Sequence, residues 1–110
     1  MADTNELEKK IGVEFKNKDL LLQALTHRSY LNENSGWHLD HNERLEFLGD
    51  AVLELVVTEY LYNNYTNPEG ELTSWRAALV NAVMLAKISE KINLNDYLLL
   101  SRGEARDTGR

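Results

Sequence analysis

The sequence of 110 residues contains no cysteine, a single proline and no long glycine- or serine-rich stretch. Without cysteine there are no disulfides and no thiolate chemistry, which suits the reducing cytoplasm. The longest apolar runs are far shorter than the roughly 20 residues that a helix needs to span a bilayer. The polar, acidic start from Met1 to Glu8 does not resemble a signal peptide. We therefore expect one cytoplasmic domain without a membrane-spanning segment.

Positive charge is also scarce, because 12 lysines and arginines face 18 acidic residues and the formal net charge is −6. A generic nucleic-acid-binding protein would usually carry a basic patch. The exception is an acidic site that holds metal ions, since the ions supply the positive charge that a phosphate substrate needs. One basic cluster could meet phosphates, although a solvated surface is its simpler interpretation: Lys9, Lys10, Lys16 and Lys18.

The hydrophobic pattern is helical over most of the chain, and no segment shows sustained strand alternation. We predict an all-α fold in which 43% hydrophobic residues supply one modest core. Helices are expected over residues 5–11, 20–25, 42–62 and 72–92. The segments between them are predicted to be a loop over 29–40, a turn over 66–70, a short apolar run packed on the core at 97–100 and an open polar end over 101–110.

The helix predicted over residues 42–62 has two opposite faces. Its apolar positions repeat at helical spacing and predict a face turned toward the core: Leu45, Leu48, Val52, Leu55 and Val56. Its acidic positions fall on the other side: Glu43, Glu46, Asp50 and Glu54. Acidic stripes are common on solvated helices, so the spacing alone favours a plain surface.

Three features point to more than a plain surface. Phe47 lies on the acidic side, where a large aromatic ring calls for a partner surface. Gly49 costs a helix interior roughly 1 kcal/mol relative to alanine, which suggests close approach of another group. Glu46 and Asp50 stand four positions apart and can reach a common point. Together they could hold Mg²⁺, which takes one or a few protein carboxylates and keeps several waters.

Histidines close to the acidic residues offer a different metal chemistry. His38 and His41 flank the start of the helix and could indicate a transition metal, but an oxygen-only Mg²⁺ site fits the acids better than zinc. The segment Thr26-His27-Arg28-Ser29 could touch RNA, although for His27 a residue that packs or hydrogen-bonds at a helix end is the simpler interpretation.

Residues 41–53, which read His-Asn-Glu-Arg-Leu-Glu-Phe-Leu-Gly-Asp-Ala-Val-Leu, resemble the signature of the ribonuclease III endonuclease domain. The resemblance continues through residues 21–29, 69–72, 76–80 and 101–104, so it covers nearly the whole chain. It implies an all-α domain that forms a homodimer. It also implies cleavage of double-stranded RNA by Mg²⁺-dependent phosphodiester hydrolysis, with Mn²⁺ as a substitute and no small-molecule cofactor.

The resemblance also assigns roles to individual acids. Glu46 and Asp50 correspond to the catalytic, metal-binding acids that this family carries on the signature helix. Glu43 and Glu69 correspond to accessory acids near the dimer interface and the bound RNA.

Two further positions of the signature are expected at the dimer interface. Phe47 corresponds to an aromatic residue that inserts into a socket on the other subunit. Arg44 is expected to pair with an acid, either one turn away in its own helix or across the subunit boundary. A plain surface ion pair is the alternative for Arg44, and it would contribute only about 0–1 kcal/mol.

The match ends before the second acidic pair of the family, an aspartate followed three residues later by a glutamate. Asp107 is followed at that spacing by Arg110, so we assign Asp107 no ligand role. We interpret residues 1–110 as a ribonuclease III endonuclease domain that is incomplete at its C-terminus, without a double-stranded RNA-binding domain and with little activity alone. The alternative is a non-catalytic ribonuclease III-like module for dimerisation or ribosome association.

Overall fold

The computed structural model describes residues 3–109, and over this range the chain is helical without any named strand. The elements in chain order are α1 (Thr4–Ile11), α2 (Lys18–Leu25), α3 (Arg28–Glu33), α4 (Glu43–Asn64), α5 (Glu69–Leu79), α6 (Ala82–Lys91), the 3₁₀ helix η1 (Leu94–Tyr97) and α7 (Arg102–Asp107). The prediction of an all-α fold is confirmed. No helix within residues 3–109 has the length and apolar character that crossing a membrane requires.

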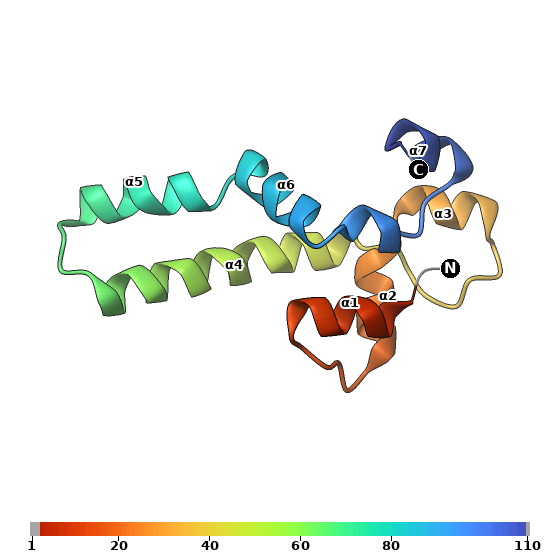
Figure 1. Cartoon of the computed structure of the whole chain (residues 1–110), viewed down its shortest axis with the longest axis horizontal. Coiled ribbons are helices and arrows are strands. Elements are labelled where there is room, and N and C mark those ends of the chain that lie inside the picture. Colours follow the sequence, from red (N-terminus) through yellow and green to blue (C-terminus); the bar gives the residue numbers. More distant parts are fainter. Residues whose placement is uncertain (1–2, 110) are drawn as a thin grey trace.

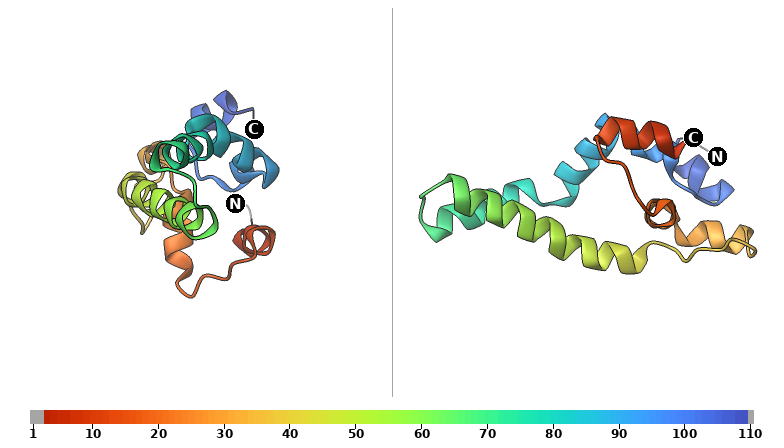
Figure 2. Two further views of the ribbon diagram at one scale, coloured as in Figure 1. Left: turned by 90° about the vertical axis from the view of Figure 1, so that its left-hand side faces the viewer. Right: turned by 90° about the horizontal axis from the view of Figure 1, so that it is seen from below.

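The molecule is elongated, with a helical arm at one end and a small globular part at the other (Figure 1). Helix α4 runs along the arm and α5 returns antiparallel beside it, so the two form a hairpin (Figures 1 and 2). Helices α1, α2, α3 and α7 gather at the opposite end. The radius of gyration is 16.4 Å, whereas about 13 Å is typical of a compact domain of this size.

The core lies in the globular part rather than in the arm. Leu7 of α1, Leu21 and Leu25 of α2 and Tyr97 of η1 are buried together. The partly buried residues that pack against this cluster are Phe15, Ile92, Leu94 and Leu98. The predicted packing of the apolar run at 97–100 is confirmed, because Tyr97 and Leu99 are both buried.

A junction of hydrogen bonds fixes where α4 begins. Thr26, which is fully buried, forms an isolated parallel bridge with Leu99. The backbone N–H of Asn42 donates to the carbonyl of Thr26 at 2.9 Å, and its side-chain amide donates to the carbonyl of Ala24 at 2.9 Å. The residue that precedes α4 is therefore tied to the connection between α2 and α3.

Helix α3 corrects the loop predicted over residues 29–40. His27 begins this helix, because its Nδ1 accepts the backbone N–H of Ser29 at 3.1 Å. Tyr30 then packs edge-on against Trp37, with 5.5 Å between the ring centroids. The loop prediction was wrong for the first half of the segment, whereas the interpretation of His27 as a helix-end residue is confirmed.

The single helix predicted over residues 72–92 is two helices, α5 and α6, and the first begins three residues earlier than predicted. Asn81 separates them. Its Oδ1 accepts the backbone N–H of Met84 at 2.9 Å and so caps α6. Its amide also donates to the carbonyls of Ala77 and Ala78, at 3.0 Å each, and so satisfies the end of α5. One asparagine thus ends one helix and starts the next.

The polar end predicted to be open over residues 101–110 contains the short helix α7, so that prediction was wrong for residues 102–107. The hydroxyl of Ser101 accepts the backbone N–H of Glu104 at 3.1 Å. The carboxylate of Glu33 accepts the backbone N–H of Arg102, at 3.2 Å from each oxygen. Residue 110 lies outside the described part of the chain.

The apolar face of α4 is the largest correction. The sequence predicted that this face would form the core, yet Leu48, Val52, Leu55 and Val56 are between 51% and 64% exposed. Leu61 is the buried residue of α4. Helix α5 packs beside α4, but within residues 3–109 no element covers the apolar face. The predicted extent of the helix was nevertheless correct to within two residues at each end.

Candidate metal site on helix α4

The acidic residues of α4 occupy one exposed side of the arm. Glu43 is the first residue of the helix, and the other acids follow at helical spacing: Glu46, Asp50 and Glu54. All four are exposed. Like charges one turn apart destabilise a helix by a few tenths of a kcal/mol per pair, so the arrangement is unfavourable unless cations offset it.

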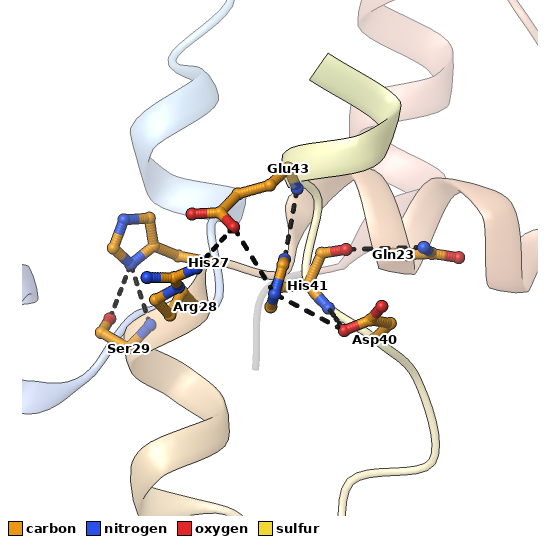
Figure 3. Close-up of polar contacts among 7 residues, drawn as sticks. All are labelled: Gln23, His27, Arg28, Ser29, Asp40, His41 and Glu43. Atoms are coloured by element: carbon orange, nitrogen blue, oxygen red, sulfur yellow. Dashed lines mark hydrogen bonds and ion pairs between the residues drawn. The ribbon is translucent and has the colours of Figure 1, made fainter. Parts of the chain in front are cut away.

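The outer acids of this stripe are Glu43 and Glu54, and arginines from two other helices neutralise them. Arg28 of α3 donates from Nη2 to Oε2 of Glu43 at 2.8 Å (Figure 3). Arg76 of α5 lies with Nε 3.5 Å from Oε1 of Glu54. The acidic stripe therefore carries one positive charge at each end, and each charge comes from a different neighbouring helix.

The inner acids, Glu46 and Asp50, have no such arginine partner. Among residues 3–109, no basic side chain lies within 4.0 Å of the carboxylates of Glu46 or Asp50. These carboxylates project from adjacent turns of one helix and are free to share a cation. Of the four acids Glu43, Glu46, Asp50 and Glu54, the two without a basic neighbour are thus the residues that the sequence singled out as a metal pair.

The chemistry of this pair fits Mg²⁺, which binds oxygen ligands and commonly takes one or two carboxylates while keeping waters. Within the described residues, no group of three or more acidic, histidine or cysteine side chains is arranged to hold a metal ion. Glu46 and Asp50 would therefore supply two ligands, and the remaining positions would be left to water and substrate oxygens.

His41 faces the outer acid rather than the inner pair. Its Nδ1 accepts the backbone N–H of Glu43 at 3.3 Å. Its Nε2 lies 3.6 Å from Oε2 of Glu43 and 3.7 Å from Oδ1 of Asp40 (Figure 3). His38 is near Asp19 of α2, at 3.3 Å. His38 and His41 thus contact carboxylates other than those of Glu46 and Asp50.

The two predicted accessory acids lie far apart within the chain. Glu43 begins α4, whereas Glu69 begins α5 at the tip of the hairpin (Figure 1). Since α4 has 22 residues and a helix rises 1.5 Å per residue, its ends are separated by roughly 30 Å. One chain therefore does not bring Glu69 to the inner pair, and its accessory role stays a prediction.

The predicted interface residues are on the surface. Phe47 is 84% exposed and so stands outside the core of its own chain. Arg44 is also exposed and forms no ion pair with an acid of residues 3–109, so the expected pairing within its own helix is not found. Gly49 is surrounded by open space, because a Cβ placed there meets no atom within 4 Å. The close packing suggested for Gly49 is thus absent within the described chain.

Sequence reasoning missed that Arg28 pairs with Glu43 and that Arg76 pairs with Glu54. Glu43 and Arg28 are 15 positions apart, and they meet only because α3 folds back beside the start of α4. Local spacing carries no signal for such a pair. The pairing of Arg76 with Glu54 depends in the same way on the antiparallel return of α5.

Known proteins share both the sequence and the fold of this chain. The profile described as Ribonuclease-III-like matches residues 17–110. Ribonuclease 3 of Enterococcus faecalis is 49% identical, over 97% of this chain and 47% of that protein. Ribonuclease 3 of Natranaerobius thermophilus is 54% identical, over 98% of this chain and 46% of that protein. The chain thus spans about half the length of these curated relatives.

A solved structure gives the same result. The nuclease domain of ribonuclease III from Campylobacter jejuni superposes with a TM-score of 0.84 at 46% sequence identity, covering 97% of this chain and 71% of that chain. That structure is described as showing flexibility in a region involved in dimer formation. Because the profile matches most of the chain and the fold agrees at high sequence identity, the chain belongs to the ribonuclease III-like family.

Proposed function

We propose that this chain is the nuclease domain of an endoribonuclease that cleaves double-stranded RNA by Mg²⁺-dependent phosphodiester hydrolysis. The observation that carries the proposal is the exposed pair Glu46 and Asp50, which has no basic neighbour among residues 3–109 although both flanking acids have one. Family membership supplies the reaction type.

Glu46 and Asp50 would hold Mg²⁺, or Mn²⁺ as a substitute with a similar preference for oxygen ligands. Bound there, the ion would supply a water of lowered pKa and charge stabilisation for the leaving oxygen. The chain's own contribution is to hold both carboxylates exposed on adjacent turns of one helix. Recognition would depend on the A-form shape and backbone of the duplex, as is usual for double-stranded RNA.

A homodimer belongs to the same proposal. The 84% exposed Phe47 and the uncovered apolar face of α4 are surfaces that a second copy would bury, and burial of one such ring contributes about 1.5–3 kcal/mol. The relative from Campylobacter jejuni is described as having a region involved in dimer formation. We place Phe47 and Arg44 at this interface. A cytoplasmic location stays a prediction.

Sedimentation tests the interface. Phe47→Ala should shift the chain toward the monomer, whereas Val13→Ala, which shortens an exposed apolar side chain outside α4, should not. A parent chain that stays monomeric at high concentration would contradict this part of the proposal.

Cleavage of a long RNA duplex tests the reaction. We expect weak Mg²⁺-dependent cutting by the parent chain, in line with its predicted low activity alone, and loss of that cutting in Asp50→Asn and Glu46→Gln. Glu54→Gln is the matched control, since it removes the same charge from an acid that Arg76 already neutralises. Equal cutting by the parent chain and Asp50→Asn would contradict the site.

A second candidate is the non-catalytic dimerisation or ribosome-associated module. The observation in its favour is that the described residues gather only two carboxylates, rather than a larger ligand set. Dimer formation by the parent chain without any cutting of duplex RNA would favour this candidate over the nuclease.

A further inference from the structure

The proposed substrate is a polyanion, yet the chain carries a net charge of −6 and presents four acids along one side of α4. A cation at Glu46 and Asp50 offsets the inner two. The outer two, Glu43 and Glu54, would repel phosphates at short range if they had no basic partner. The side chains that contact Glu43 and Glu54 therefore decide whether an RNA backbone can approach the ends of this stripe.

The two arginines at these ends have different surroundings. Arg76 is 33% exposed, and besides its contact with Glu54 its Nη1 donates to the hydroxyl of Thr58 at 3.0 Å. Its guanidinium thus cross-links α5 to α4 through contacts with Glu54 and Thr58. Arg28 is 64% exposed, and within residues 3–109 its side chain makes one hydrogen bond, to Glu43. A guanidinium has five N–H donors, so most of the donors of Arg28 face solvent.

The backbone that carries Arg28 is held firmly. On one side of it, His27 accepts the N–H of Ser29 and contacts its hydroxyl at 2.8 Å. The same hydroxyl accepts the backbone N–H of Ser101 at 2.9 Å, which ties α3 to the segment before α7. Figure 3 shows Arg28 beside His27 and Ser29, with its guanidinium directed at the carboxylate of Glu43. The base of the side chain is fixed and its end is aimed by one carboxylate.

We propose that Arg28 contacts a backbone phosphate of the bound duplex RNA and that Glu43 is its positioning residue; this inference rests on the proposed function. The planar guanidinium suits a phosphate because two parallel N–H groups can donate to two of its oxygens. Glu43 stands three residues before Glu46, and such positions are neighbours on a helix. A phosphate on Arg28 would therefore lie about one helical turn from the proposed metal pair.

Two possible roles of Glu43 predict opposite effects of its removal on RNA affinity. If Glu43 were only one more negative charge, then Glu43→Ala would strengthen the binding of a polyanion. If Glu43 positions Arg28, the same substitution frees the guanidinium and weakens binding. The second effect must also disappear once Arg28 has been replaced, because there is then nothing left to position.

The test is equilibrium binding of a fluorescently labelled RNA duplex to the full chain, measured by anisotropy at several salt concentrations. Ca²⁺ replaces Mg²⁺ as a hard cation with oxygen ligands, and a gel confirms that the duplex is intact afterwards. Lys87→Gln is the matched control, since it removes one exposed positive charge from α6, outside α3, α4 and the N-terminal lysine cluster. Circular dichroism checks that each variant keeps its helical content.

We expect Arg28→Gln to weaken binding about tenfold, which is the loss of one charge-assisted contact, and to lower the salt slope by roughly one unit. Glu43→Ala should weaken binding in the parent chain and have no further effect in Arg28→Gln. Lys87→Gln should stay within about twofold of the parent affinity.

Two results would overturn the inference while leaving the proposed function intact. One is duplex binding by the parent chain that Arg28→Gln reduces no more than Lys87→Gln does. The other is tighter binding by Glu43→Ala, which would remove the positioning role. Failure of the parent chain to bind the duplex at all would overturn the proposed function together with this inference.

Discussion

Replacing Gly49 by alanine should stabilise the isolated monomer. Gly49 lies inside α4, and a Cβ built there meets no atom within 4 Å, so the added methyl group causes no steric conflict. Glycine is about 0.8–1.0 kcal/mol less favourable than alanine in a helix interior. The free energy of unfolding should therefore rise by about 1 kcal/mol, which corresponds to an increase in Tm of roughly 4–8 °C for a small domain.

Urea unfolding followed by circular dichroism measures this change. The titration needs several protein concentrations, because self-association adds a concentration-dependent term to the apparent stability. Gly70→Ala is the control, since Gly70 also lies in a helix with open space around it. A lower free energy of unfolding for Gly49→Ala at the lowest concentration would refute the reasoning, because it would mean that the chain itself packs against this position.

The same substitution should have the opposite effect on assembly. Phe47 stands two residues away and is proposed to enter an interface, so a second copy would approach α4 near residue 49. We expect Gly49→Ala to raise the dissociation constant of the dimer in sedimentation experiments while it stabilises the monomer. An unchanged dissociation constant would separate Gly49 from the interface.

Three further predictions concern the globular part and the break between α5 and α6. Leu25→Ala removes most of a side chain that is 4% exposed and should lower the free energy of unfolding by about 2–5 kcal/mol, measured by urea unfolding. Asn81→Ala removes the cap of α6 and should cost about 1 kcal/mol in the same titration. The hydrogen bond from Lys18, followed by that from the backbone of Phe15, lowers the pKa of Glu8 below its ordinary value of 4.5. The stability that Glu8 contributes is complete above the pKa of the unfolded state and is lost as pH falls through the lower pKa of the folded state. Glu8→Gln should therefore flatten the acid side of the stability profile measured by thermal unfolding.

Local patterns in the sequence were sufficient wherever the deciding contacts are local. The periodic apolar residues of α4 predicted its extent. The i, i+4 spacing of Glu46 and Asp50 singled out the two inner acids of the set Glu43, Glu46, Asp50 and Glu54, which are the two of that set without a basic neighbour. The break at Asn81 was missed because the apolar repeat continues across it, while its capping depends on how one side chain turns.

The errors arose where contacts join distant segments. Periodicity showed that α4 has an apolar face, but it could not show whether another element lies against that face, and Val52 and Leu55 are exposed. The contact of Arg28 with Glu43 spans 15 positions and has no signature in either segment alone. The sequence therefore singled out the acids of the candidate site but not the arginines that lie beside them.

The most direct test of the account is calorimetric titration of the chain with Mg²⁺. If Glu46 and Asp50 share the ion, the parent chain binds it, and Asp50→Asn and Glu46→Gln each reduce the affinity by about tenfold or more, since each removes one of two charged ligands. Glu54→Gln, which removes an acid already paired with Arg76, should leave the affinity within about twofold of the parent value. Equal losses in Glu54→Gln and Asp50→Asn, or no loss in Asp50→Asn, would contradict the assignment of the inner pair as the metal site.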